Sequence, residues 1–167
     1  MEILLVSFIG GFVGSLFMDI TETKMAKAGI HSGVTGEYIG RWVIGLMKGV
    51  LFHPNIKTSA PEKNEIRMGQ YFHFVLGGGV VALLYPFFHA FISFGEPLGH
   101  LFSATVFGLL TSIFPWFILM PSFGWGVFGL KAPEGARPIV SPILSHIPYG
   151  FGIGLTVVTY YGITALQ

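Results

Sequence analysis

Charged residues are scarce in this chain. Only 10% of its 167 residues are Asp, Glu, Lys or Arg, whereas 52% are hydrophobic. A soluble domain carries about 25% charged residues, because its surface must be covered with groups that water solvates. The scarcity of charge therefore excludes a soluble enzyme and a disordered chain, and the net charge of +1 provides no field for binding nucleic acid. The composition predicts a membrane protein.

Cysteine is absent altogether. Its absence excludes disulfides, thiolate metal sites and cysteine nucleophiles, and it leaves the redox compartment of the protein undetermined.

The sequence contains several long apolar stretches. A helix needs roughly 20 mainly apolar residues to cross about 30 Å of hydrocarbon. The stretches 3–22, 67–94, 98–120 and 142–164 meet this requirement. They predict an all-α integral membrane protein with a single membrane domain over 1–167, built as a four-helix transmembrane bundle.

The stretch 37–53 is apolar on one helical face only. Its two faces are Ile39, Val43, Leu46 and Val50 on one side, and Arg41, Gly45 and Lys48 on the other. Because this stretch is short and carries two cations, it predicts an amphipathic helix that lies along the membrane interface between spans one and two. Pro54 is expected to end it.

The cations occupy only two connections between the predicted spans. The first connection holds Lys24, Lys27, Arg41, Lys48, Lys57, Lys63 and Arg67, and the last holds Lys131 and Arg137. With four spans, both connections lie on the same side of the membrane. The positive-inside rule then places them in the cytoplasm and both termini outside.

Glycine pairs spaced by four residues predict close helix packing. They are Gly10 and Gly14, Gly45 and Gly49, and Gly150 and Gly154. Such motifs bring helix backbones together, either within the protein or between two copies of it.

Ionisable residues inside a membrane are costly and mark function by default. Asp19 and Glu22 share a helix face at the end of the first span, His73 lies in the second span and His146 in the fourth. At 1.5 Å per residue, His73 is about 9 Å inside the nearest flanking cation and Asp19 about 7–8 Å. His146 has a similar depth. These depths predict one polar site just beneath the cytoplasmic surface.

Several chemistries fit this site. Asp19, Glu22, His73 and His146 are a possible ligand set for a divalent transition metal such as Fe, Zn or Mn. The same groups suit a proton relay or general acid/base chemistry. A cofactor or other ligand would be bound by His73, His146, Arg41 and Tyr149. In the structural alternative, Asp19 pairs with Arg41 or a histidine only to neutralise a buried charge.

The other histidines are weaker candidates. His89 and His100 flank the short outer turn near Glu96 and could form a second site there. His31 and His53 lie in the cytoplasmic connection, where solvation needs no further explanation.

Five motifs resemble an uncharacterised family of small four-span bacterial inner-membrane proteins, which is grouped as a domain of unknown function. The motifs are MDITETK at 18–24, GRW at 40–42, GQYFHFVLG at 69–77, PWFILMPSFGWGVFG at 115–129 and SPILSHIPYGFGIGL at 141–155. The resemblance implies the fold and an inner-membrane location, and it implies no activity. Met120 and Pro142 depart from the family pattern.

Two functions follow as hypotheses. The first is an inner-membrane protein with a polar ligand- or metal-binding pocket near the cytoplasmic face, acting as a small enzyme or as a redox or metal-handling protein. The alternative is a non-catalytic accessory subunit or scaffold, docked onto a larger membrane complex or assembled as a homo-oligomer.

Overall fold

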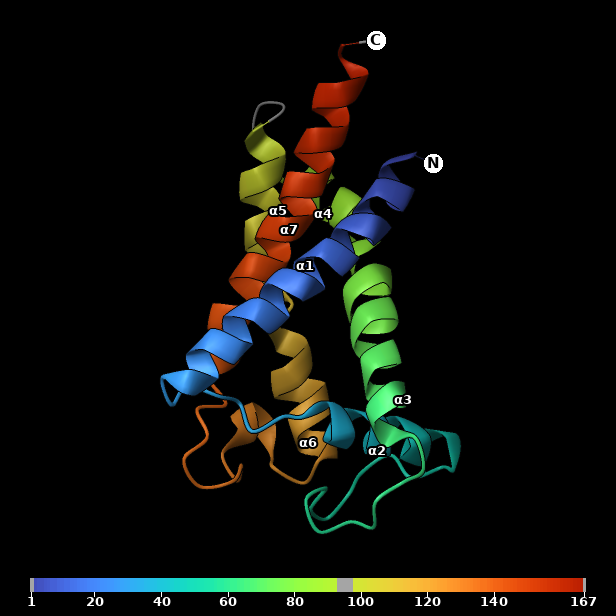
Figure 1. Ribbon diagram of the computed structural model, residues 1–167, viewed down its shortest axis with the longest axis vertical. Helices are drawn as coiled ribbons and strands as arrows, with labels where there is room; N and C mark the ends of the chain where they lie inside the picture. Colours follow the sequence, from blue (N-terminus) through green and yellow to red (C-terminus); the bar gives the residue numbers. More distant parts are fainter. Residues whose placement is uncertain (1, 93–97, 167) are drawn as a thin grey trace. The chain divides into compact units, whose positions relative to one another are not determined.

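The computed structural model describes residues 2–92 and 98–166, and the regular elements within these ranges are helices (Figure 1). In chain order they are α1 Glu2–Lys27, α2 Gly36–Met47, α3 Glu65–Tyr71, η1 Phe72–Val80, α4 Tyr85–Phe91, α5 Leu98–Leu110, η2 Pro115–Leu119, α6 Met120–Ser122, η3 Val127–Gly129 and α7 Val140–Thr164. The elements η1 and η2 are π-helices and η3 is a 3-10 helix. Glu96, near which a second site was predicted, lies outside the described residues.

Within the described residues, three helices are long and apolar enough to cross a membrane. They are Glu2–Lys27, Glu65–Phe91 and Leu98–Ser122, with mean hydropathies of 2.1, 1.8 and 1.8. The chain is therefore a multi-pass membrane protein in contact with the lipid bilayer. The fourth predicted span corresponds to α7, whose apolar residues are interrupted by Ser145, His146 and Thr156. Because α7 is not among these three helices, the four-span bundle stays a prediction.

The chain divides into two compact units. Unit 1 comprises Met1–Thr21, Phe74–Thr111 and Ile143–Gln167, and unit 2 comprises Glu22–His73 and Ser112–Pro142. Each unit has a hydrophobic core of its own.

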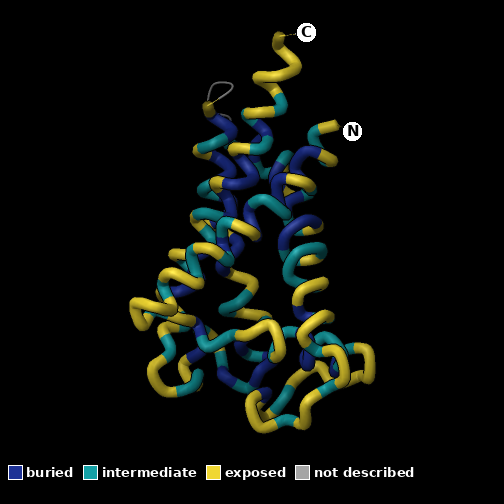
Figure 2. The backbone as a smooth tube through the Cα atoms, in the orientation of Figure 1, coloured by how far each residue is buried: buried dark blue, intermediate teal, exposed yellow. Residues whose placement is uncertain are grey.

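In unit 1, helices α1, α5 and α7 approach each other so closely that only glycine fits at their contacts. A Cβ at Gly108 of α5 would lie 2.5 Å from the Cα of Gly150 on α7, and a Cβ at Gly152 would lie 2.6 Å from the Cα of Gly14 on α1. Buried positions recur along these helices (Figure 2). Close packing of this kind holds helices together where hydrocarbon offers no hydrophobic driving force. The glycine motifs predicted on α1 and α7 therefore act in packing within the protein.

Unit 2 has an aromatic core beneath its loops. The core residues are Trp42, Ile56, Met120, Phe123 and Trp125. The loop between α2 and α3 is joined to the C-terminal end of α6 by two backbone hydrogen bonds. The N–H of His53 donates to the carbonyl of Ser122 (2.8 Å) and the N–H of Ile56 donates to that of Phe123 (2.9 Å). Apolar burial and backbone pairing together fix this loop.

Helices α2 and α3 of unit 2 also pack through glycine. A Cβ at Gly40 would overlap the carbonyl oxygen of Glu65 and lie 2.8 Å from the nitrogen of Gly69. A Cβ at Gly69 would in turn overlap the carbonyl oxygen of Gly36. The close contact of α2 with α3 is therefore made at Gly40 and Gly69, whereas the sequence suggested Gly45 and Gly49.

The predicted boundary of the amphipathic helix was wrong at its C-terminal end. Helix α2 ends at Met47, because Gly49 adopts the left-handed conformation (φ +82°) and the N–H of Val50 returns to the carbonyl of Gly45 (2.8 Å). These features form a Schellman motif, which terminates helices through a glycine. Pro54 therefore does not end the helix.

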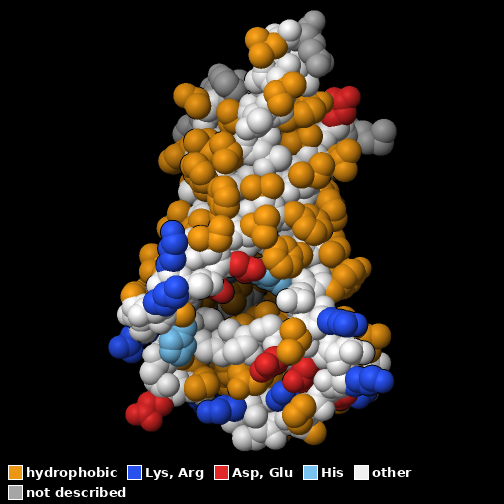
Figure 3. Space-filling view, viewed as in Figure 1, with side chains coloured by type: hydrophobic (Ala, Val, Ile, Leu, Met, Phe, Trp, Pro, Cys, Tyr) orange, Lys and Arg blue, Asp and Glu red, His pale blue; other side chains and the backbone are white. Residues whose placement is uncertain are grey.

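The two units differ in their content of lysine and arginine. The sequence of unit 1 contains no Lys or Arg, so all nine cations of the chain belong to unit 2. Figure 3 shows the Lys and Arg side chains over unit 2 and a mainly hydrophobic surface over unit 1. Unit 1 therefore has the composition of a lipid-embedded body, and unit 2 that of a body at the water interface.

Candidate functional site

The four predicted metal ligands are distributed over both units. Asp19 on α1 and His146 on α7 belong to unit 1, whereas Glu22 and His73 belong to unit 2. The imidazole of His146 packs edge-on against the ring of Tyr149, with centroids 6.3 Å apart. Within residues 2–92 and 98–166, no three His, Asp or Glu side chains are grouped so that they could hold a metal ion. The common site of these four residues stays a prediction.

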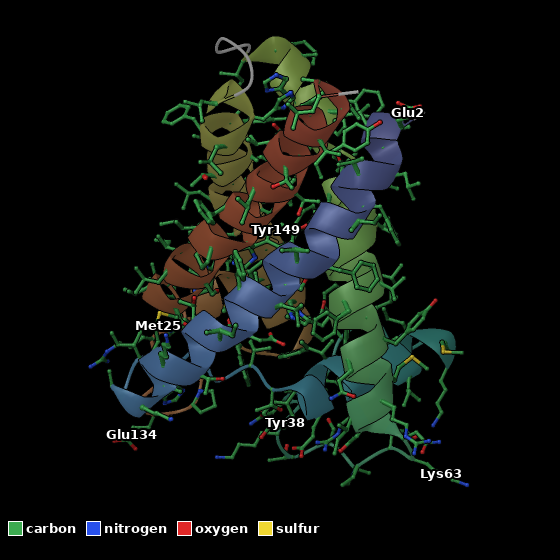
Figure 4. All side chains as sticks on the ribbon, turned by 45° about the horizontal axis from the view of Figure 1, so that its top comes forward. Glu2, Met25, Tyr38, Lys63, Glu134 and Tyr149 are labelled. Atoms are coloured by element: carbon green, nitrogen blue, oxygen red, sulfur yellow. The ribbon has the colours of Figure 1, made fainter. Side chains whose placement is uncertain are left out.

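Tyr149 of α7 lies among the helices of unit 1 and is only 2% exposed (Figure 4). Its hydroxyl donates to the carbonyl of Gly78 at 2.7 Å and lies 3.3 Å from that of Gly77. A π-helix leaves carbonyl oxygens without the usual partner four residues on, so a phenol from a neighbouring helix can satisfy them. In unit 1 this hydroxyl joins α7 to η1. Cofactor binding by Tyr149 stays a prediction.

Arg41 of α2 is buried and fully engaged in a network of unit 2. Its Nε and Nη2 atoms donate to the two carboxylate oxygens of Glu65, at 2.8 and 2.9 Å. Its Nη1 atom donates to the carbonyls of Ile56 (2.9 Å) and Ser59 (3.1 Å). The hydrogen bonds to Glu65 raise the pKa of Arg41 above its usual value. This bidentate geometry is the strongest form of arginine–carboxylate pairing.

Glu65 is a residue that sequence reasoning missed. It opens α3, and its carboxylate also accepts the backbone N–H of Glu62 at 2.8 Å. This reach back over three residues resembles the glutamate half of a capping box. The sequence held a signal for the Arg41–Glu65 pair, because an acidic residue at the start of an apolar helix and an arginine that becomes buried both require partners. Arg41 and Glu65 join α2, α3 and the loop between them.

His53 lies beside this network in unit 2. Its Nδ1 atom is 3.0 Å from the hydroxyl of Ser59, which itself donates to the carbonyl of Asn55 (3.0 Å). Nδ1 is therefore the donor, and Nε2 carries the lone pair. Nε2 is buried and has no hydrogen-bond partner within the described parts of the chain. Burial, and then the positive charge of Arg41, lower the pKa of His53.

A polar pocket lies within unit 2, at the C-terminal end of α1. Its volume is about 240 Å³, and it is lined by Glu22, Thr23, Ala26, His31, Ser32, Val34 and Ser141. A hydrogen bond from the N–H of Arg137 to the carbonyl of His31 (2.6 Å) fixes one wall. The pocket contains one predicted site residue, Glu22, together with His31, which had been assigned to solvent. It supplies a carboxylate, an imidazole and three hydroxyl groups to one cavity.

Residues 8–160 match the family described as "Protein of unknown function (DUF2938)". The chain belongs to this family. The DUF2938 match confirms the resemblance to an uncharacterised family over most of the chain, and it brings no activity with it. A search of curated proteins and a search of solved structures each found no match. Function must therefore be argued from the residues themselves.

Proposed function

We propose that this membrane protein binds a small polar ligand in the pocket at the end of α1. The observation that carries the proposal is the composition of the pocket wall. Glu22, His31 and three hydroxyl-bearing residues line it, and none of its lining residues is a Lys or Arg. Ser32 and Ser141 are buried, Glu22 is half-buried, and His31 and Thr23 are exposed at the pocket. Polar groups that converge on a concave surface are typical of ligand sites.

The chemistry of the wall favours a ligand that donates hydrogen bonds. A carboxylate accepts only, and hydroxyl oxygens accept readily, so a primary ammonium group with its three N–H donors is a good match. At about 240 Å³, the cavity is smaller than most sites for drug-sized molecules. A small amine, free or as the headgroup of a lipid, is therefore the proposed class of ligand.

The distribution of lysine and arginine indicates from which side of the membrane the ligand enters. The pocket belongs to unit 2, which holds every cation of the chain. By the positive-inside rule, the ligand is taken from the cytoplasmic side.

Ethanolamine is the probe that tests this proposal. Thermal unfolding of the purified protein is measured with and without ethanolamine at constant ionic strength. A ligand present at 100 times its Kd stabilises the folded state by about 2.7 kcal/mol. We expect a rise in Tm that disappears in Glu22→Gln. Adding phosphatidylethanolamine to the micelles instead of ethanolamine distinguishes a lipid headgroup from a free amine.

Glu134→Gln is the matched control, because it removes the same charge from an exposed position of unit 2 that does not line the pocket. Equal shifts in Glu22→Gln and Glu134→Gln, or no shift with either probe in the wild type, would contradict the proposal.

Elemental analysis of the same preparation tests the alternative hypothesis from the sequence, a bound metal ion. Stoichiometric Fe, Zn or Mn that is lost in Asp19→Asn, His73→Ala and His146→Ala would favour a metal ion held by the predicted ligands over an organic amine.

A further inference from the structure

Four buried polar side chains of unit 1 gather where α4 is followed by α5. Tyr85 and Ser103 are 0% exposed, His100 is 4% exposed and His89 is 9% exposed. Tyr85 and His89 lie on α4, and His100 and Ser103 lie on α5 (Figure 1). Burying polar groups inside a membrane protein is costly, so such a cluster requires an explanation beyond packing.

Hydrogen-bond distances link the four side chains in a row, and both hydroxyl groups also have backbone acceptors: Ser103 donates to the carbonyl of Gly99 (2.8 Å) and Tyr85 donates to that of His100 (3.1 Å). The row is continuous for protons when these hydroxyl groups turn from the carbonyls to the side-chain acceptors. Nδ1 of His89 lies 2.7 Å from the hydroxyl oxygen of Ser103, which lies 3.0 Å from that of Tyr85. The hydroxyl of Tyr85 lies 2.7 Å from Nδ1 of His100. Each link is short enough to pass a proton, and each hydroxyl can both donate and accept. An imidazole therefore stands at each end of a path made of two hydroxyl groups.

The two imidazoles are also stacked face to face. Their centroids are 3.9 Å apart, with an angle of 22° between the planes. Rings that lie nearly parallel direct their nitrogen lone pairs in parallel, which does not suit a shared metal ion. Two imidazolium ions at this separation would repel each other strongly in a region of low dielectric. The pair therefore has room for one excess proton.

The surroundings of His100 are aromatic, and few charged residues belong to unit 1. The ring of Tyr161 on α7 stacks on the other face of His100, with centroids 5.2 Å apart, and an electron-rich face stabilises a cation. The charged residues of unit 1 within the described ranges are Glu2 and Asp19. Glu2 accepts a hydrogen bond from Tyr160, whose ring contacts Tyr161.

The geometry points to a proton relay in which His89 and His100 share one excess proton through Ser103 and Tyr85. The imidazolium of His89 gives its Nδ1 proton to the oxygen of Ser103. The Ser103 proton passes to the oxygen of Tyr85, and the Tyr85 proton passes to Nδ1 of His100. At the end His89 is neutral, His100 is an imidazolium ion, and both hydroxyl groups are restored. The relay is built from residues of unit 1 and the pocket proposed above from residues of unit 2, so either proposal can fail without the other.

The alternative is a structural cluster whose only role is to join α4 to α5. Hydrogen bonds between buried side chains do hold membrane helices together. Repulsion between the stacked rings, however, limits the pair to one proton with or without a relay, and only a relay lets that proton move rapidly between the two histidines. The test is therefore based on proton exchange rather than on stability.

Nitrogen NMR of histidine-labelled protein in lipid nanodiscs measures this exchange, with signals assigned from His89→Gln and His100→Gln. In the wild type, we expect the one proton that the pair holds to exchange rapidly, so that His89 and His100 each give one averaged signal and their protonated fractions add up to one. In Tyr85→Phe, which keeps the ring and cuts the path, exchange should become slow, and separate signals of the protonated and neutral forms should replace each averaged signal.

Two matched controls accompany this variant. Tyr161→Phe removes a tyrosine hydroxyl beside His100 that is not a link of the path and should keep the averaged signals. If Tyr85→Phe does not fold, Ser103→Ala cuts the same path. Thr105→Ala is its control, because Thr105 is also on α5 and donates within its own helix, to the carbonyl of Leu101 (2.7 Å). Two independent protons in the wild type, no uptake at all, or averaged signals that survive both cuts would overturn the relay.

Discussion

Arg41 illustrates how this chain buries one of its few charges. The Arg41 side chain is 7% exposed and the Glu65 side chain 12% exposed. Removing a charge from water carries a large penalty, which the partner charge and additional hydrogen bonds must offset. Here a carboxylate and two backbone carbonyls together satisfy the guanidinium. The pair therefore fixes geometry in unit 2, and its role in stability can be measured.

We predict that Arg41→Ala costs about 3–5 kcal/mol of unfolding free energy, because it leaves the Glu65 carboxylate buried without its partner. Replacing both residues, as Arg41→Met with Glu65→Leu, should recover part of this loss. Denaturant unfolding in mixed micelles measures both effects.

Lys48→Ala is the matched control for the buried pair. It breaks the Lys48–Glu62 pair, in which the lysine side chain is 57% exposed. An exposed pair contributes about 0.2–1 kcal/mol. Equal losses of unfolding free energy in Arg41→Ala and Lys48→Ala would show that the buried network stabilises the protein no more than the exposed pair does.

His53 gives unit 2 a dependence on pH. Because the pKa of His53 is lowered in the folded protein, the unfolded chain binds a proton more readily. The stability that neutral His53 contributes is therefore complete above about pH 6.5, the ordinary pKa of histidine, and is lost as the pH falls below it. We expect His53→Gln to flatten the decline of Tm with acidification over this range. A wild-type decline of the same steepness in His53→Gln would contradict the assignment.

At the scale of elements, glycine decides which helices can touch. On α2, Gly40 faces the backbone of α3, whereas nothing lies within 4 Å of a Cβ built at Gly36. Two glycines of one helix, spaced by four residues, thus meet opposite environments.

We predict that Gly40→Ala destabilises unit 2 by at least about 1–3 kcal/mol, because the new methyl group forces α2 away from α3. Gly36→Ala should be neutral or should stabilise the helix by up to about 1 kcal/mol, since alanine is the better helix former. Thermal unfolding of the two variants, followed by circular dichroism, measures the difference. If the two substitutions have equal effects, the close crossing of α2 and α3 is wrong.

Helix positions could be predicted from the sequence better than helix ends. Apolar stretches of the length of a span located α1, the Glu65–Phe91 helix and the Leu98–Ser122 helix. The C-terminal end of α2 was missed because proline was given more weight than glycine, and that of α1 was missed because only the apolar stretch was counted. Helix α1 continues to Lys27, where the N–H of Ile30 returns to the carbonyl of Met25 (2.9 Å) and Gly29 has a φ of +78°. The same motif ends α2, so the glycine after each last turn was the better signal.

The candidate site was harder to predict than the fold. Periodicity and depth identify which residues are polar and roughly how deep they lie, but they do not identify partners. Arg41 and Glu65 are 24 residues apart in the chain, and no repeat relates them. Ser103 and Tyr85 escaped notice because serine and tyrosine are common in membrane helices, and only the packing of α4 against α5 aligns them with two histidines.

At the scale of the whole molecule, the separation of charge predicts a topology that can be tested directly. The chain has no cysteine, so a single introduced cysteine is the only thiol that reacts. We expect Lys63→Cys, in unit 2, to be labelled from the cytoplasmic side by a maleimide that does not cross membranes. Gly162→Cys, on α7 of unit 1, should be labelled from the opposite side.

Intact spheroplasts and inverted vesicles provide the two accessible sides. Labelling of both positions from one side would contradict the four-span topology and would favour three spans.

The confinement of lysine and arginine to unit 2 also determines how the protein responds to trypsin, which cleaves after these two residues. Every possible cleavage point lies in unit 2, and residues 68–131 and 132–167 contain no internal site, because Arg137 is followed by Pro138 and trypsin does not cleave before proline. Digestion of the membrane-embedded protein should therefore remove pieces of unit 2 and leave the segments of unit 1 as a few long, apolar peptides. Mass spectrometry based on trypsin would then undercount this protein, and a protease that cleaves after aromatic residues would detect it more faithfully.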